Sequence, residues 1–271
     1  MTDYQRICER VCTAARRAGE FIAEQRLTFS YDKVEQKGRH DLVSYVDKEA
    51  EKMVVADLQQ IVPEAGFITE EGTIEQASGQ RFRWIIDPLD GTTNFIHGLP
   101  PYCVSLALME GDELVVGVVY EVFSKECFYA WKGSKAYLDG KEIRVSTIDN
   151  FDSTLTAVGL SHSSKDTISD LLKQMEVLLH ETSGIRRIGS AAIDLCYVAC
   201  GRVDGFFQKN LSPWDVAAGA LIVKQAGGMV TDYSGGDDYV FGKQILAANP
   251  LVYNDYKNKI IQMKHTISSL G

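Results

Sequence analysis

The segment Trp84-Ile-Ile-Asp-Pro-Leu-Asp-Gly-Thr-Thr-Asn-Phe95 decides how this 271-residue chain is interpreted. Its apolar, β-branched beginning predicts a buried strand that ends at Asp87 and turns sharply through Pro88. Asp90 follows three residues after Asp87. We therefore expect both carboxylates and the Leu89 carbonyl to point into one small volume. Hard cations such as Mg²⁺ or Mn²⁺ prefer oxygen ligands of this kind.

The residues after Asp90 extend this expectation from a cation to a phosphate. Gly91-Thr-Thr-Asn94 is a run of small and hydroxyl residues suited to start a helix, whose free N–H groups can hold a phosphate. Thr92 is placed to orient a water molecule. Asp-Pro and Asp-Gly are also common turn dipeptides. In isolation the two aspartates would be interpreted as turn residues, but their context favours a site.

Two distant segments supply further carboxylates. Glu70 and Glu71 stand at the end of a predicted strand that starts at Gly66, and Glu70 is the better placed to reach the same volume. Asp215 ends Ser212-Pro-Trp-Asp215 and heads a predicted helix. That pattern is typical of a capping box with Pro at the first helical position. A carboxylate there can cap the helix and bind a cation, so the four acids predict a centre with more than one metal ion.

The rest of the chain predicts mixed α and β structure. Amphipathic helices are expected within residues 1–28 and over 45–62, and strands over 66–70 and 81–87. Apolar runs on both sides of Glu110-Gly-Asp-Glu113, and a third after Ser124-Lys-Glu126, predict antiparallel hairpins over 103–131. Beyond Ile148 strands and helices alternate, over 154–159, 166–181, 185–188, 190–200, 203–207, 213–226, 229–232, 245–248 and from 252.

This change of pattern predicts two halves. Residues 1–148 would form an N-terminal α+β half with the antiparallel sheet and most metal ligands. Residues 149–271 would form a C-terminal α/β half with Asp215 and the residues that contact substrate. No linker or internal repeat separates them, so we expect a compact boundary.

Composition excludes several classes of function. The net charge of −9 opposes binding to nucleic acid or to an anionic membrane surface. No signal segment and no long apolar run is present, so we expect a cytoplasmic protein without a membrane span. The six cysteines include no CxxC pair, and we expect them to be reduced.

Competing motifs fail on spacing. The chain has no EF-hand series, no GxGxxG, and no Ser or Thr after the Lys of its P-loop-like stretch 236–243. Structural calcium binding is disfavoured because the acids come from three separate segments rather than one loop. His97 lies close to the predicted site but is interpreted as structural or surface, because a hard cation does not need imidazole.

Taken together, these segments resemble the inositol monophosphatase family within the lithium-sensitive, magnesium-dependent phosphatases. The resemblance covers nearly the whole chain and rests on Glu70-Glu71, Asp87–Phe95, Trp214-Asp-Val-Ala-Ala-Gly219 and Ala226-Gly-Gly228, in this order. It implies a layered αβαβα sandwich of the sugar-phosphatase type, of mixed α+β / α/β class. It also implies a homodimer and inhibition by lithium.

The resemblance further implies roles for individual residues. Glu70, Asp87 and the Leu89 carbonyl would hold one Mg²⁺ and Asp87, Asp90 and Asp215 a second, with a third ion near Glu70. Catalysis would involve Glu70, Thr92 and Asp90, with water attacking phosphorus in line. The residues expected to contact substrate are Gly91, Thr92, Gly189, Ser190, Ala191, Gln208 and Asp215. Lys37 and Asp47 resemble the family's supporting positions.

One position departs from the family pattern. Inositol-specific members commonly carry Glu where this chain has Gln208. Gln both donates and accepts hydrogen bonds and carries no charge, so it can bind hydroxyl groups without the same preference for inositol. The predicted substrate is a small phosphorylated polyol or sugar, with myo-inositol monophosphate first. The alternatives are 3′-phosphoadenosine 5′-phosphate, fructose 1,6-bisphosphate, NADP, or a regulatory binding role like that of some bacterial relatives.

Overall fold

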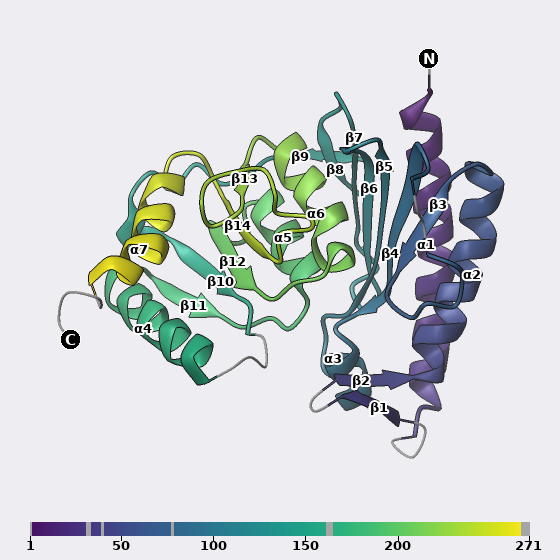
Figure 1. The fold of residues 1–271 in the computed structure, drawn as a ribbon, viewed down its shortest axis with the longest axis horizontal. Coiled ribbons are helices and arrows are strands. Elements are labelled where there is room, and N and C mark those ends of the chain that lie inside the picture. Colours follow the sequence, from purple (N-terminus) through teal and green to yellow (C-terminus); the bar gives the residue numbers. More distant parts are fainter. Residues whose placement is uncertain (1, 31–33, 39–40, 77–78, 161–164, 267–271) are drawn as a thin grey trace.

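The computed structural model describes residues 2–30, 34–38, 41–76, 79–160 and 165–266, and these build five stacked layers (Figure 1). Helices α1 (Tyr4–Leu27) and α2 (Tyr45–Ile61) cover the outer face of a seven-stranded sheet. Helices α5 (Ala191–Ala199) and α6 (Pro213–Gln225) lie between it and a five-stranded sheet. Helices α4 (Lys165–Glu181) and α7 (Tyr253–Thr266) cover the far side. The predicted αβαβα sandwich and mixed fold class are confirmed.

The seven-stranded sheet is antiparallel apart from its first pair. Its strands follow chain order: β3 (Gly66–Thr69), β4 (Phe82–Asp90), β5 (Cys103–Glu110), β6 (Glu113–Glu121), β7 (Cys127–Trp131), β8 (Ala136–Leu138) and β9 (Lys141–Ile143). β3 and β4 pair in parallel. The hairpins expected over 103–131 are present, whereas β8 and β9 were not predicted. Their turn, Asp139-Gly140, has φ values of 48° and 82°, which is typical of a tight hairpin turn.

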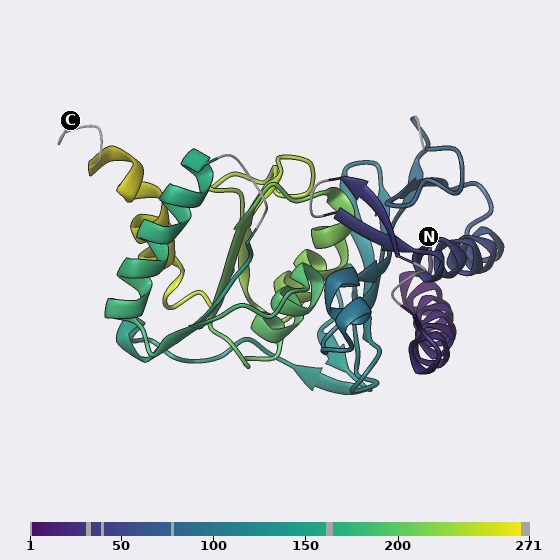
Figure 2. The ribbon, with the colours of Figure 1, turned by 90° about the horizontal axis from the view of Figure 1, so that it is seen from below.

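The five-stranded sheet combines parallel and antiparallel pairs. Its strands are β10 (Leu155–Val158), β11 (Gly184–Arg186), β12 (Gly205–Lys209), β13 (Met229–Thr231) and β14 (Gln244–Ala248), in the spatial order β11-β10-β12-β14-β13. A 3₁₀ turn, η2 (Phe151–Ser153), precedes it. Short helix α3 (Thr92–His97) and the unpredicted hairpin of β1 (Val34–Gly38) and β2 (Asp41–Ser44) lie together beside the first sheet (Figure 2).

Apolar side chains fill the space between each pair of layers. The cluster between the two sheets joins Ile85 and Phe128 of the first sheet to Phe206 and Ile245 of the second. The sheets change between Ile143 and Leu155, near the predicted boundary. Because this core is shared across the boundary, the division into halves 1–148 and 149–271 stays a proposal.

The two central helices approach each other closely. At Gly219 of α6, a Cβ atom would lie 2.6 Å from Cβ of Leu195 on α5, a distance that real side chains do not adopt. At Gly117 of β6, a Cβ atom would lie 2.7 Å from the Ala218 carbonyl oxygen. Glycine at both positions lets α6 pack directly on α5 and on the first sheet, and this fixes where α6 begins.

Two other expectations concern the whole chain. All six cysteines are free thiols, as expected for reduced residues. Within the described ranges, no helix is both long and apolar enough to cross a bilayer.

The packing of α5 on α6 predicts a large stability difference between two Leu→Ala variants. Leu195 is fully buried in the central core, whereas Leu251 is 58% exposed. Leu195→Ala should lower the free energy of unfolding by about 2–5 kcal/mol, because it removes buried contacts and leaves a cavity. Leu251→Ala should change it by less than about 0.5 kcal/mol. Urea unfolding with a shared m-value measures both, and equal effects would contradict this packing.

Candidate active site

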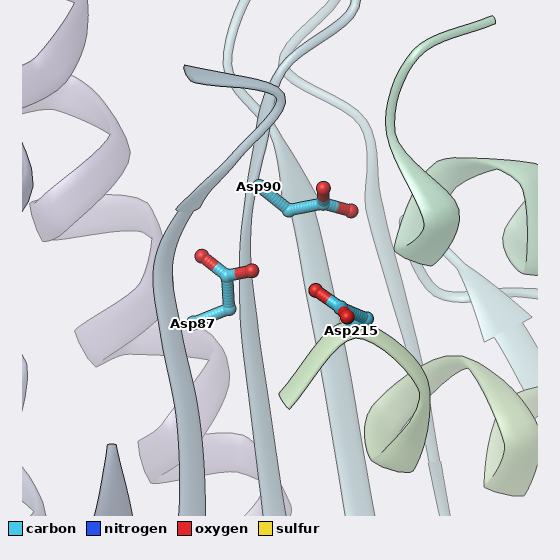
Figure 3. Close-up of side chains that lie close together, drawn as sticks. All are labelled: Asp87, Asp90 and Asp215. Atoms are coloured by element: carbon cyan, nitrogen blue, oxygen red, sulfur yellow. The ribbon is translucent and has the colours of Figure 1, made fainter. Parts of the chain in front are cut away.

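Three aspartates from distant parts of the chain meet in the structure (Figure 3). Asp87 and Asp90 come from the end of β4, and Asp215 comes from the first turn of α6. One carboxylate oxygen from each residue lies within 4.8 Å of the others. The structure therefore brings together three of the four acids that the sequence predicted to meet.

The end of β4 aims its two aspartates through an irregular pairing with β5. Asp87 lies opposite Ser105 and Asp90 opposite Cys103, so three steps on β4 match two on β5. Such a bulge redirects side chains locally. The Leu89 N–H donates to Asp87 Oδ1 over 2.9 Å and fixes that carboxylate. The strand was expected to end at Asp87, and it instead continues through the bulge to Asp90.

Asp215 combines the two functions considered for it. Its Oδ2 accepts a hydrogen bond of 2.6 Å from the Ser212 N–H, which completes a capping box with Pro213 at the first helical position. The same carboxylate also reaches Asp87 and Asp90. The Trp214 carbonyl accepts a hydrogen bond from Ser105 Oγ over 3.2 Å, which ties the start of α6 to β5.

Asp90 is held by the first turn of α5. Its Oδ2 accepts hydrogen bonds from Ser190 Oγ over 2.7 Å and from the Ala192 N–H over 2.8 Å. Nearby, Asn94 Nδ2 donates to the carbonyls of Pro101 and Ile188 over 2.8 and 3.0 Å. The stretch Gly189–Ala191, expected to contact substrate, is thereby held beside the aspartates.

The electrostatics of the cluster favour a cation. Burial raises the pKa of Asp87 well above its ordinary value, and the negative charges of Glu70, Asp90 and Asp215 raise it further. Burial also raises the pKa of Asp90, against hydrogen bonds from Ser190 and Ala192 that lower it. Burial and Asp90 raise the pKa of Asp215 to about 7. A divalent cation would relieve this repulsion, and an all-oxygen donor set fits Mg²⁺ or Mn²⁺.

Glu70 and Thr92 flank the aspartates as predicted. Glu70 follows β3, its N–H donates to the Ile86 carbonyl over 3.2 Å, and its side chain lies within hydrogen-bonding reach of Asp87. Thr92 Oγ1 lies 3.0 Å from both Asp47 Oδ1 and the Leu89 carbonyl oxygen. Its single proton can go to only one of them at a time.

Supporting residues around Glu70 were only partly foreseen. Asp47 accepts from the Ser44 N–H over 2.9 Å, so the capping box of α2 also positions Thr92. Buried Glu51, which was not predicted, accepts hydrogen bonds from the N–H groups of Glu71 and Thr73 over 2.8 and 2.7 Å. These bonds fix the loop that carries Glu70. The side chain of Lys37 lies outside the described part of the chain.

The remaining predicted residues surround the aspartates. Gly91 has φ +93°, and a Cβ there would lie 3.2 Å from the Pro101 carbonyl oxygen, so this tight turn requires glycine. A cavity of about 100 Å³ opens beside the aspartates, lined by Asp90, Gly159, Arg187, Gly189, Ser190, Ala191, Asp194, Gln208, Leu211 and Asp215. His97 is exposed at the last position of α3, in agreement with its interpretation as a surface residue.

Arg187 and Asp194 were missed by the sequence analysis. Arg187 is exposed and contributes a positive charge near Asp90. Asp194 is only 1% exposed. Its signal was present in the sequence, because it is the only charged residue in the otherwise apolar helix Ala191–Ala199. A single acid inside a buried apolar helix is uncommon unless it is paired.

Comparisons with known proteins agree with this geometry. The model of the inositol monophosphatase family matches residues 3–268. The chain is 43% identical over 239 residues to "Nus factor SuhB" of Escherichia coli K12, covering 88% of this chain and 90% of that protein. It is 37% identical, with the same coverage, to "Inositol-1-monophosphatase" of Mesorhizobium japonicum. The crystal structure of extragenic suppressor protein suhB from Bartonella henselae superposes with a TM-score of 0.86 at 38% identity, covering 93% and 97% of the two chains.

The raised pKa of Asp215 predicts how the metal-free protein responds to pH. The folded protein keeps a proton on Asp215 up to about pH 7, whereas the unfolded chain releases it near its ordinary pKa of 3.8. The contribution of protonated Asp215 to the free energy of unfolding is therefore fully present below about pH 4. It is lost as the pH rises through about 7. Asp215→Asn retains an oxygen for Ser212 and removes the charge. In EDTA at pH 8 the variant should be more stable than wild type, by up to about 4 kcal/mol.

Thermal or urea unfolding between pH 5 and 8 measures this difference. Asp112→Asn is the matched control, because it removes the same charge from a fully exposed side chain. The control should keep the wild-type pH profile. A less stable Asp215→Asn protein at pH 8 in EDTA would show that the cluster is not electrostatically strained.

Proposed function

The chain belongs to the inositol monophosphatase family, and from this premise we propose that it is a Mg²⁺-dependent phosphomonoesterase. It would hydrolyse myo-inositol monophosphate, or a similar small polyol monophosphate, to the alcohol and inorganic phosphate. The observation that carries this proposal is the meeting of Asp87, Asp90 and Asp215 beside an open cavity. The charges of Glu70, Asp90 and Asp215 that act on Asp87 there are negative, so the cluster is suited to divalent cations.

The donor atoms would divide between at least two ions. Glu70, Asp87 and the Leu89 carbonyl would hold one, and Asp87, Asp90 and Asp215 a second, with Mn²⁺ able to replace Mg²⁺ and a third ion near Glu70. Bound cations of this type stabilise both the entering and the leaving oxygen of a phosphoryl displacement and lower the pKa of water. The hydrogen bonds from Ser190, Ala192 and Ser212 support this assignment, because they hold two of the carboxylates in place without a metal.

The protein groups nearest the reaction would orient a water molecule and take its proton. Thr92 donates its single proton to Asp47 or to the Leu89 carbonyl, so its oxygen is left to accept a hydrogen bond from the water. Glu70, beside Asp87, is the neighbouring carboxylate that can receive the proton. The hydrogen bonds that Glu51 accepts from Glu71 and Thr73 would keep the loop that carries Glu70 in position during this step.

The substrate would span the cavity. Gly91 and Thr92 are proposed to contact the phosphate, and Gly189, Ser190, Ala191 and Gln208 the alcohol. At Gly159 a Cβ atom would lie 1.6 Å from Gln208 Oε1, so the Gln208 amide fits only because residue 159 is glycine. A neutral amide can bond the hydroxyl groups of several different alcohols, so it does not select one of them. The alternatives remain 3′-phosphoadenosine 5′-phosphate, fructose 1,6-bisphosphate and NADP.

A regulatory binding role is the second candidate. The observation in its favour is the 43% identity to a protein named as a Nus factor. The net charge of −9 opposes direct binding to nucleic acid, so a protein would be the expected partner, and the absence of nucleic-acid binding stays a prediction. A cytoplasmic location, a homodimer and inhibition by lithium are further proposals that rest on the family resemblance.

The enzymatic proposal predicts the behaviour of Asp90→Asn. Asn supplies one oxygen, which Ser190 and Ala192 can still bond, and an amide nitrogen that does not bind Mg²⁺. We expect phosphate release from inositol 1-phosphate to fall roughly 100-fold or more. Losing a residue that binds the metal directly should lower activity more than losing a residue that only supports such a ligand. The fold should persist, as measured by circular dichroism.

Phosphate release with and without MgCl₂ tests the activity itself. A panel of inositol 1-phosphate, glycerol 2-phosphate, 3′-phosphoadenosine 5′-phosphate, fructose 1,6-bisphosphate and NADP distinguishes the substrates. Asp112→Asn serves again as the surface control and should hydrolyse like wild type. Wild-type turnover by Asp90→Asn would contradict the metal assignment. No hydrolysis of any ester by the wild type would favour the regulatory role.

A further inference from the structure

Asp194 has no assigned role in the proposed hydrolysis, and its surroundings are unusual. It stands in the first turn of α5, is 1% exposed, and lines the cavity beside Asp90 and Asp215. Its Oδ1 atom is buried and has no hydrogen-bond partner among the described residues. Its neighbours are satisfied: Ser190 Oγ and the Ala192 N–H both bond Asp90.

An unpaired buried carboxyl group destabilises a protein. Burial raises the pKa of Asp194 well above its ordinary value, the charge of Asp90 raises it further, and Arg187 only partly opposes them. An apolar residue at this position would avoid the desolvation penalty. A residue that weakens the fold, lines a cavity and leaves a buried oxygen without a hydrogen-bond partner is therefore a candidate for binding a ligand.

The cavity around Asp194 has a definite chemical character. Asp90, Asp194 and Asp215 disfavour an anion there unless metal ions accompany it. Gln208 offers both a donor and an acceptor, and exposed Arg187 offers donors. The volume of about 100 Å³ exceeds what one water molecule needs. A neutral group with several hydroxyls matches these partners, because each hydroxyl can donate to a carboxyl oxygen and accept from an amide or guanidinium.

We propose that Asp194 determines specificity by accepting a hydrogen bond from a hydroxyl group on the alcohol part of the substrate, beside the hydroxyls that Gln208 binds. This inference rests on the proposed phosphomonoesterase function and extends it. It names the substrate class as phosphate esters of polyols with a free hydroxyl near the ester.

The test compares esters with and without hydroxyl groups. 4-Nitrophenyl phosphate has none, whereas inositol 1-phosphate and glycerol 2-phosphate carry hydroxyls next to the ester. Asp194→Leu keeps the branched shape but cannot form a hydrogen bond. It should raise KM for the polyol esters about 10-fold or more, and change KM for 4-nitrophenyl phosphate less than about twofold. Asp194→Asn keeps an acceptor oxygen and should restore KM to within about threefold of wild type.

Unfolding in EDTA separates this role from a structural one. Both variants should melt at or above the wild-type temperature, because each removes a buried unpaired carboxyl group. Equal changes in KM for all esters, or no change for any, would overturn the inference while leaving the phosphatase proposal intact. A wild type that hydrolyses 4-nitrophenyl phosphate but neither polyol ester would contradict both the inference and the proposed polyol substrate, while phosphomonoesterase activity itself would stand.

Two further outcomes are distinguishable. If Asp194→Leu shifts the Mg²⁺ concentration for half-maximal hydrolysis of 4-nitrophenyl phosphate more than about twofold, Asp194 acts on the metal centre and the inference is wrong. If the wild type hydrolyses none of the esters with Mg²⁺, the proposed function itself fails, and the specificity role fails with it.

Discussion

The site depends on an electrostatic constraint, the burial of several carboxylates beside one another. Asp87 experiences the negative charges of Glu70, Asp90 and Asp215. The fold tolerates this repulsion because the acids are anchored by uncharged donors: Leu89 N–H for Asp87, Ser190 and Ala192 for Asp90, and Ser212 N–H for Asp215. The carboxylates are thus held in place before any cation binds, and cation binding would relieve the repulsion and stabilise the fold.

The location of the cluster explains why the five layers matter for the chemistry. Asp87 and Asp90 belong to the first sheet, whereas Asp215 and the residues that hold Asp90 belong to the two central helices. Close packing at Gly117 and Gly219 sets the position of α6, and hence the distance from Asp215 to β4. A small shift of that helix would separate the three carboxylates, so core packing and any affinity of the cluster for a cation are physically linked.

The sequence predicted most elements and the acids because their signals are local. Apolar periodicity revealed the long helices, and the Asp87–Asp90 turn and the Asp215 capping box are short patterns. The features that the sequence did not predict depend on tertiary contacts or belong to short elements. Glu51 resembles any helical acid until the 69–73 loop folds onto it. The β1–β2 hairpin is short and partly charged, and the β8–β9 hairpin has three-residue strands. The Asp139-Gly140 pair is a hairpin-turn signal in the sequence, but no hairpin was predicted there.

The two ends of the cavity differ in how freely their residues can change. At the end expected to bind phosphate, each aspartate is expected to bind a cation and also accepts a hydrogen bond from a backbone or hydroxyl group, so a substitution that removes its oxygens removes two interactions at once. At the end expected to bind the alcohol, Gln208 lies over Gly159, and Asp194 makes no hydrogen bond through Oδ1. A change at either residue leaves the bonds that hold Asp87, Asp90 and Asp215 in place. Gln208 and Asp194 can therefore change while the arrangement of the three aspartates stays the same, and the departure at Gln208 is compatible with an intact acidic cluster.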